Sequence, residues 1–242
     1  MKELRVTVWS EGFADDPKGA AAYPEDVNTV IANFLAREPG LTVRTAGLLQ
    51  PQQGLPDEVL DTTDVLVWWS HLHNDAIASD RVDRIVRRIT ADGMGFLALH
   101  SGIYCAVMDR LVGPVCGRRQ YRERGERERI WVIDRSHPIV DGLERDYIDV
   151  PHSEMYSEPN GRCAPDELVF ISWFQGGEVL RSGCCYRRGA GKLFAFATGH
   201  EEYPIYHQPD IQRVLTNAVR WAAPIRTTPV THCVAEPLEP LE

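Results

Sequence analysis

The pattern that most restricts the fold of this chain is an alternation of strand-like segments with segments of helical periodicity. The strand-like segments are residues 4–9, 41–46, 65–69 and 95–99. Between them, apolar side chains recur three or four positions apart at residues 27–35 and 82–89, which is the spacing of one helix face. The runs at 65–69 and 95–99 contain no polar residue, as expected for strands that helices cover on both faces. This alternation predicts a parallel sheet between two layers of helices.

Local signals place the ends of the predicted helices. Pro24 is suited to the first turn of the helix at 27–35, because the amide hydrogen that proline lacks has no partner there. Ser79 is the expected N-cap of the helix at 82–89, and a further helix is predicted at 104–112.

The second half of the chain follows a different pattern. Strands are predicted at residues 130–133, 167–174, 178–187 and 192–198, and Pro209 opens a final helix. The segment Gln175-Gly176-Gly177 joins the second and third of these strands, which is typical of a β-hairpin. We therefore predict a three-layer α/β fold at residues 1–223, with a mostly parallel sheet flanked by helices and an added β-hairpin in the C-terminal half. A proline-rich tail at 224–242, extended or disordered, follows.

The composition of the 242 residues favours one domain and excludes some partners. A net charge of −9 argues against nucleic-acid binding, and the mixed Arg and Glu at residues 118–129 are typical of a solvated charged face. We find no signal peptide and no apolar run of the ~20 residues that a membrane span needs, so we expect a cytoplasmic protein without membrane contacts. The six cysteines, which form no CxxC pair, should then be reduced, and adjacent Cys184 and Cys185 are predicted to pack in the core.

Six of the eight histidines lie just after predicted strands or in neighbouring loops: His71, His73, His100, His152, His200 and His207. Of these, His71, His100 and His200 each follow a different strand of the predicted parallel sheet, and ligands of such sheets bind beyond the carboxyl ends of the strands. Imidazole is the commonest metal ligand and a proton carrier near neutral pH, so this set is a candidate metal or catalytic site. Alternatively, each histidine is an ordinary polar residue of a loop.

Carboxylates and aromatic residues gather in the same segments. Glu154 lies two positions after His152, which puts both side chains on one face of a strand, and Glu201 and Glu202 directly follow His200. A carboxylate here could be a metal ligand, an orienting partner, a general base or a surface acid. Aromatic faces stack on the C–H surfaces of sugars, so a carbohydrate pocket and an ordinary core edge both fit the aromatic residues. They are Trp69, Tyr156, Trp173, Tyr203 and Tyr206.

Nucleophilic catalysis has weaker support. The pair His100-Ser101 lies at a strand-to-helix turn, where α/β hydrolases place their nucleophile, but Leu99 replaces the first glycine of the G-x-S-x-G motif. Cys105 lies about one helical turn further on and is a weaker candidate. The chain contains no phosphate-binding glycine motif, so nucleotide binding has no support.

Several segments together resemble the ThuA-like (trehalose utilisation) family. Two long segments are specific: residues 170–179 (FISWFQGGEV) and 199–207 (GHEEYPIYH). Shorter segments at residues 68–71, 99–102, 154–158 and 181–184 agree with them, and the resemblance covers about residues 4–223. It implies a class I glutamine amidotransferase-like fold, of the flavodoxin-like kind, which agrees with the predicted parallel sheet.

The resemblance also implies a function. It implies a role in the catabolism of trehalose and related sugars, with a bound divalent metal, zinc. Amidotransferases of this superfamily have a cysteine at the turn where this chain has His100 and Ser101, which implies that glutaminase activity is absent. The chain departs from the family at Asn74 and Ile103, where the family tends to have further histidines, and this puts a shared activity in doubt.

Our first hypothesis is a metal-assisted enzyme, a hydrolase or isomerase, that acts on a trehalose-like disaccharide or a keto-sugar derivative. His71, His100 and His200 would hold zinc. Glu154 would be the general base, and Glu201 would orient a ligand. The substrate pocket would be lined by Trp69, Tyr156, Tyr203 and His207, of which His207 alternatively caps the final helix. The rival hypotheses are a metal-free sugar-binding or regulatory domain and an interaction scaffold, and in each case we expect a homo-oligomer.

Overall fold

A single mixed sheet forms the centre of the molecule. The structure is a computed structural model that describes residues 3–12, 17–115, 120–225 and 236–240. The described residues form a nine-stranded sheet of order β2-β1-β3-β4-β9-β8-β7-β5-β6. The strands are β1 (Leu4–Ser10), β2 (Leu41–Gly47), β3 (Val65–Ser70), β4 (Gly95–His100), β5 (Gln120–Val132), β6 (Tyr147–Ser157), β7 (Glu167–Phe174), β8 (Val179–Arg188) and β9 (Gly191–Phe196).

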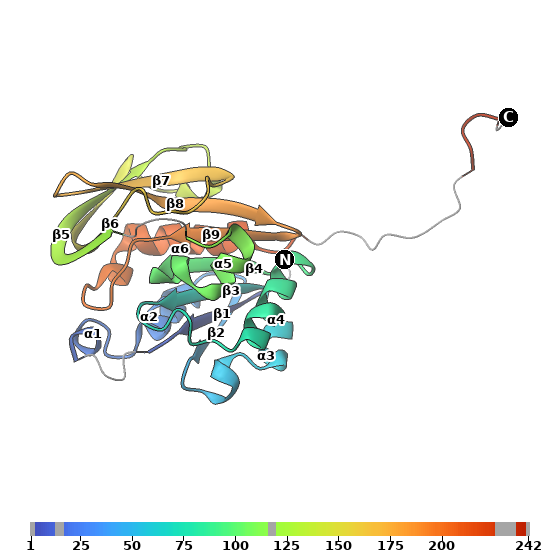
Figure 1. The fold of residues 1–242 in the computed structure, drawn as a ribbon, viewed down its shortest axis with the longest axis horizontal. Helices are drawn as coiled ribbons and strands as arrows, with labels where there is room; N and C mark the ends of the chain where they lie inside the picture. The colour runs from blue at the N-terminus through green and yellow to red at the C-terminus, as the bar shows by residue number, and fades with distance from the viewer. Residues whose placement is uncertain (1–2, 13–16, 116–119, 226–235, 241–242) are drawn as a thin grey trace.

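The sheet has a parallel half and an antiparallel half that meet at β9. Strands β2, β1, β3, β4 and β9 pair in parallel, whereas β8, β7, β5 and β6 continue the sheet in antiparallel order. Figure 1 shows the parallel strands below β9 and the antiparallel strands above it. The predicted α/β fold is confirmed, as is the hairpin of β7 and β8. The antiparallel part exceeds one hairpin because the long strands β5 and β6 join it.

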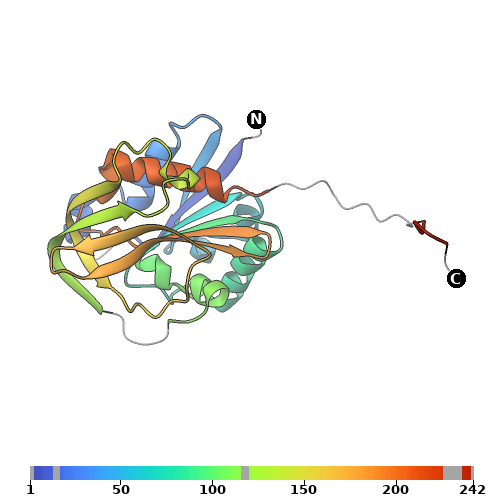
Figure 2. The same ribbon diagram turned by 90° about the horizontal axis from the view of Figure 1, so that it is seen from above.

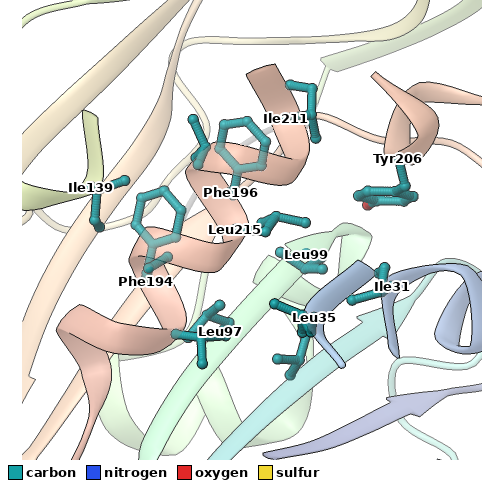
Figure 3. Close-up of a cluster of buried hydrophobic side chains, with 14 of the residues drawn as sticks. Ile31, Leu35, Leu97, Leu99, Ile139, Phe194, Phe196, Tyr206, Ile211 and Leu215 are labelled. Atoms are coloured by element: carbon teal, nitrogen blue, oxygen red, sulfur yellow. The ribbon is translucent and has the colours of Figure 1, made fainter. Parts of the chain in front are cut away.

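Helices cover both faces of the parallel half. They are α1 (Pro17–Ala22), α2 (Val27–Leu35), α3 (Asp57–Asp61), α4 (Ser79–Thr90), α5 (Ala106–Val112) and α6 (Pro209–Ala222). One core cluster joins α2 and α6 to β4 and β9 (Figure 3), and a second joins α4 and α5 to the opposite face. Figure 2 shows α6 and α5 on opposite sides of the sheet, which gives the three predicted layers.

Two expected helix starts were wrong, and a third was nearly right. Asp26, not Pro24, precedes α2, because its Oδ1 accepts the Val27 amide (2.6 Å), a bond that proline cannot provide. Ser79 is the first helical residue of α4, and Ala78 occupies the cap position. The helix predicted near 104–112 is confirmed as α5, which begins two residues later, after a 3₁₀ turn, η2 (Ser101–Tyr104).

The segment of mixed Arg and Glu forms most of β5. Its Arg122 pairs with Glu126 and with Glu178, in keeping with a charged surface. Glu128, however, is only 1% exposed, so the predicted solvated face is wrong at this position. Residues 118 and 119 lie outside the described residues.

The chain beyond α6 contains the predicted tail. Its described residues 236–240 are exposed, whereas 226–235 and 241–242 lie outside the described residues. Among the helices that the structure describes, none is long and apolar enough to cross a membrane.

The start of β4 provides a test of the packing of α6 on the sheet. A Cβ at Gly95 would lie 2.5 Å from the Ala222 carbonyl oxygen, so Gly95→Ala must displace the end of α6. We expect it to lower the free energy of unfolding by ~1–3 kcal/mol, measured by urea denaturation. In Gly47→Ala, the new Cβ would lie 3.4 Å from the Ser10 carbonyl oxygen, so this control should change little. Equal effects of the two variants would contradict the prediction.

Candidate functional site

Three histidines meet at the carboxyl edge of the parallel half. His71 directly follows β3, His100 ends β4, and His200 follows β9. Because β3, β4 and β9 are adjacent and parallel, their carboxyl ends lie side by side. The ring centroid of His71 lies 4.9 Å from that of His100 and 5.1 Å from that of His200, and the last two are 5.4 Å apart. The predicted convergence of the three histidines is therefore present.

The turn after β4 fixes the orientation of His100. Its backbone has φ 53° and ψ −134°, a conformation that non-glycine residues rarely adopt and that marks a sharp strand-to-helix turn. The imidazole stacks on Trp69 with the ring centroids 5.8 Å apart. Trp69 itself is fully buried (0% exposed), and its ring supports one face of the His100 imidazole. This burial corrects the expectation that Trp69 lines a substrate pocket.

Glu201 joins the three histidines in one compact group. His71 Nδ1 lies 2.8 Å from His100 Nε2, and His71 Nε2 lies 3.4 Å from Glu201 Oε1. The His200 Nδ1 atom lies 3.6 Å from Glu201 Oε2 and accepts the Glu202 amide at 3.1 Å. One potential ligand atom from each of the four side chains lies within 4.8 Å of the others. We call His71, His100, His200 and Glu201 the histidine cluster.

Glu154 of β6 lies against this cluster. Its Oε2 is 3.5 Å from His100 Nε2 and 3.9 Å from His200 Nε2, and the residue is only 3% exposed. Burial raises the pKa of Glu154 to about 8. This pKa is the net result of burial, of a hydrogen bond from Tyr156 that lowers it, and of the nearby Glu123 and Glu201, which raise it. This is a tuned carboxyl group, as expected of a general base.

Burial also keeps His100 in the form that binds metals. The pKa of His100 is well below its usual value, first because the ring is buried and then because His71 and His200 are near. His100 is therefore a neutral imidazole at neutral pH, and a neutral imidazole carries the lone pair that a metal ion requires.

The remaining predicted residues fall into different surroundings. Tyr156 is buried, and its hydroxyl exchanges a hydrogen bond with Ser101 Oγ (2.6 Å), so it positions Glu154 and Ser101. Tyr203 lies beside His200, with the ring centroids 5.2 Å apart. The exposed His207 stacks on Tyr23. The capping alternative for His207 is wrong, because Gln208 precedes α6.

The two other candidate histidines lie outside the cluster. His73 is exposed, and so is His152, whose Nδ1 lies 3.0 Å from the Gly125 carbonyl oxygen. The spacing of His152 and Glu154 predicts one shared strand face. Glu154 is buried, with its Oε2 3.9 Å from His200 Nε2, whereas His152 is exposed and its ring centroid lies 6.2 Å from that of Tyr203, the neighbour of His200.

Other side chains hold the loop of His71 and were not recognised in the sequence. The buried Glu11 accepts the amides of Leu72 (2.8 Å) and His73 (2.9 Å). Asn74 donates to the His71 carbonyl at 3.0 Å, so this departure from the family pattern has a structural role. Ile103, the other departure, is 5% exposed and packs in the core. No local pattern distinguishes Glu11 from a surface acid.

Glu128 links the strands behind the cluster. Its carboxylate accepts the hydroxyls of Ser153 (2.7 Å), Ser172 (2.5 Å) and Thr198 (2.8 Å), which come from β6, β7 and the segment after β9. Ser153 adjoins Glu154, and Thr198 lies two residues before His200. Glu128 thus fixes the two segments relative to each other. In the sequence it is one of several Glu residues in a charged run and gives no signal of this role.

Comparison with known proteins identifies the family. A family model described as ThuA, trehalose utilisation, matches residues 5–222. The chain belongs to the ThuA family. No curated protein matched the chain in sequence.

Solved structures confirm the fold of this ThuA-family chain. A ThuA-like protein of Parabacteroides merdae has a TM-score of 0.70 at 13% identity, with 94% of each chain covered. A ThuA-like protein of Bacteroides uniformis has a TM-score of 0.61 at 16% identity, with 91% of each chain covered. The glutaminase domain of Trypanosoma brucei CTPS has a TM-score of 0.51 at 11% identity, over 90% of this chain and 94% of that one. These likenesses show the amidotransferase-like fold that the sequence resemblance implied.

The burial of Glu128 predicts how the stability of the protein depends on pH. Burial raises the pKa of Glu128, so folding favours its protonated form. The stability of the wild type should therefore fall, relative to Glu128→Gln, as pH rises from the carboxyl pKa of the unfolded chain towards the raised pKa of the folded one. Urea denaturation of both proteins at several pH values measures this difference. A difference that is constant with pH, or one that grows in favour of the wild type, would contradict it.

Proposed function

We propose that this ThuA-family protein is a metal-assisted enzyme that acts on a trehalose-like disaccharide or a keto-sugar derivative. The observation that carries the proposal is the convergence of His71, His100, His200 and Glu201 within 4.8 Å. Three imidazoles and one carboxylate form a donor set that suits zinc. A zinc ion bound there would polarise a carbonyl group or lower the pKa of a water molecule.

The residues around the cluster suit acid–base work. Glu154 has a pKa of about 8 without a metal ion; a zinc ion nearby would favour its carboxylate, which would then take a proton from the substrate or from water. Tyr156 orients Glu154 through its hydrogen bond and in turn exchanges one with Ser101. Proton transfer of this kind suits hydrolysis and isomerisation, the two reaction classes that we propose.

Glutaminase activity is not part of the proposal. The turn after β4 carries His100 in place of a cysteine nucleophile. Cys105 is fully buried, and burial raises the pKa of its thiol to about 12, so it is not a reactive thiolate.

One observation favours a metal-free sugar-binding domain as the second candidate. His71 Nδ1 and His100 Nε2 are 2.8 Å apart, which is hydrogen-bond distance. Two nitrogens on one tetrahedral zinc ion are about 3.3 Å apart, so zinc must replace this bond and separate the rings slightly. Measurement of bound zinc distinguishes the two candidates.

Zinc binding gives the first test. The purified full chain should bind one zinc ion, measured by elemental analysis and by titration against a chelator. Loss of a residue that only orients a metal ligand typically lowers metal affinity ~10–100-fold. His100→Ala should lower zinc affinity by more than this, because it removes a ligand itself. His73→Ala is the matched control, since His73 is an exposed histidine of the His71 loop, and it should bind zinc like the wild type. Equal binding by all three proteins, or none by the wild type, would contradict the proposal.

The ionisation of Glu154 gives the second test. In the zinc-free protein, the ¹³C carboxyl resonance of Glu154 should titrate near pH 8, and Glu154→Gln identifies that resonance by its loss. Zinc should move the titration to lower pH, because a cation nearby favours the carboxylate. A titration near pH 4 without zinc, or one that zinc leaves unchanged, would be the opposite result.

A further inference from the structure

The histidine cluster itself has no room for a sugar ring. The side chains of His71 and Glu201 are 12% and 10% exposed, and those of His100 and His200 are 0% and 2% exposed. This degree of burial suits an ion or a single reacting group. A sugar must therefore bind beside the cluster.

A groove of about 360 Å³ lies next to the cluster. One wall is the β6 segment from Asp149 to His152, and the other runs from Tyr203 to Gln208. Tyr203 belongs both to this groove and to the surroundings of the cluster. Its ring centroid lies 5.2 Å from that of His200 and 6.2 Å from that of His152. One aromatic ring thus separates the groove from the cluster.

The groove is held open by contacts within its walls. Gln208 Nε2 donates to the Asp149 carbonyl at 3.0 Å and ties the two walls together. Tyr23 Oη donates to the Tyr203 carbonyl at 2.6 Å, and its ring stacks on His207 at 5.6 Å between centroids. The buried Val150 and Ile205 contribute to the lining. These contacts make the groove a preformed site, as binding sites for small molecules usually are.

The chemistry of the lining matches a neutral sugar. Tyr203, Pro151 and Pro204 present apolar ring faces, which suit the C–H face of a pyranose. The Asp149 carboxylate is already paired with Arg127 and Arg129, so the groove offers no unpaired carboxylate to a cation. Among the residues that line it, none is Lys or Arg, so it has no permanently charged cation to bind an anion.

His152 adds a hydrogen-bond acceptor whose tautomer is fixed. The Gly125 carbonyl can only accept, so the His152 Nδ1 atom at 3.0 Å carries the hydrogen. In the neutral imidazole, Nε2 then keeps its lone pair and can accept a hydrogen bond from a sugar hydroxyl.

We infer that this groove binds one ring of a neutral sugar, with Tyr203 between that ring and the histidine cluster. The inference rests on the proposed function and names its substrate site: the groove provides affinity, and the cluster acts on a group that extends past Tyr203. A two-ring sugar fits this division, because one ring occupies the groove while the bond or carbonyl of the other reaches the cluster.

Isothermal titration of the zinc-supplemented full chain with trehalose tests the inference. His152→Ala should weaken trehalose binding by roughly five- to tenfold, the effect of one hydrogen bond lost from a bound ligand. His152→Gln keeps an amide oxygen as acceptor and should recover most of the affinity. The control His73→Ala alters an exposed histidine outside the groove and should bind trehalose like the wild type.

His100→Ala separates this inference from the proposed function. It should lose zinc, and adding His152→Ala to it should still weaken trehalose binding roughly five- to tenfold, because His152 lines the groove and His100 does not. Absence of trehalose binding to the wild type, or equal binding by His152→Ala, would overturn the groove while zinc binding still supported the metal centre. The reverse result, with trehalose bound and no zinc, would overturn the metal-assisted enzyme and leave the groove intact.

Discussion

Parallel pairing of β9 with β4 is the contact on which the site depends. Leu99 pairs with Phe196. His100, the last residue of β4, and His200, which follows β9, therefore emerge at the same edge of the sheet. Phe196 and its neighbour Phe194 pack between the sheet and α6, which stabilises this pairing from one face (Figure 3). The chain reaches β9 only after it has built the antiparallel strands β5 to β8, and β6 of that set delivers Glu154.

The same burial that stabilises the sheet determines the electrostatics of the cluster. His100 is held neutral and the pKa of Glu154 is raised because both groups are removed from water. A closed group of imidazoles beside carboxyl groups suits a cation far better than it accommodates a sugar. We therefore assign the cluster to chemistry and the neighbouring groove to recognition.

The fold is shared with a protein of different activity, so the side chains at the site matter more than the fold. The glutaminase domain with the same fold is similar to this chain at 11% identity, which carries no shared chemistry. In this chain the sharp turn after β4 holds an imidazole, which Trp69 supports by stacking. The turn geometry thus serves to aim a ring at His71 and His200.

The sequence by itself determined the elements and the edge at which the histidines meet. Helical and strand periodicity are local properties, and the rule that parallel strands share a carboxyl edge needs only the order of elements, so His71, His100 and His200 could be chosen without a structure. Helix caps were less certain, because Asp26 replaced Pro24 through a single side-chain hydrogen bond.

Only the tertiary structure decided the roles that depend on burial and on contacts distant in sequence. Glu128 belongs to a charged run of sequence, which predicts an exposed side chain. In the sheet it is buried instead, and its carboxylate accepts hydrogen bonds from three hydroxyl groups. Trp69 stacks on His100, and the buried Glu154, unlike the exposed His152, lies against the cluster. The groove likewise exists only in the folded chain, because its two walls come from β6 and from the segment after β9. Side-chain direction and burial follow from packing across the whole chain, and no local sequence pattern encodes them.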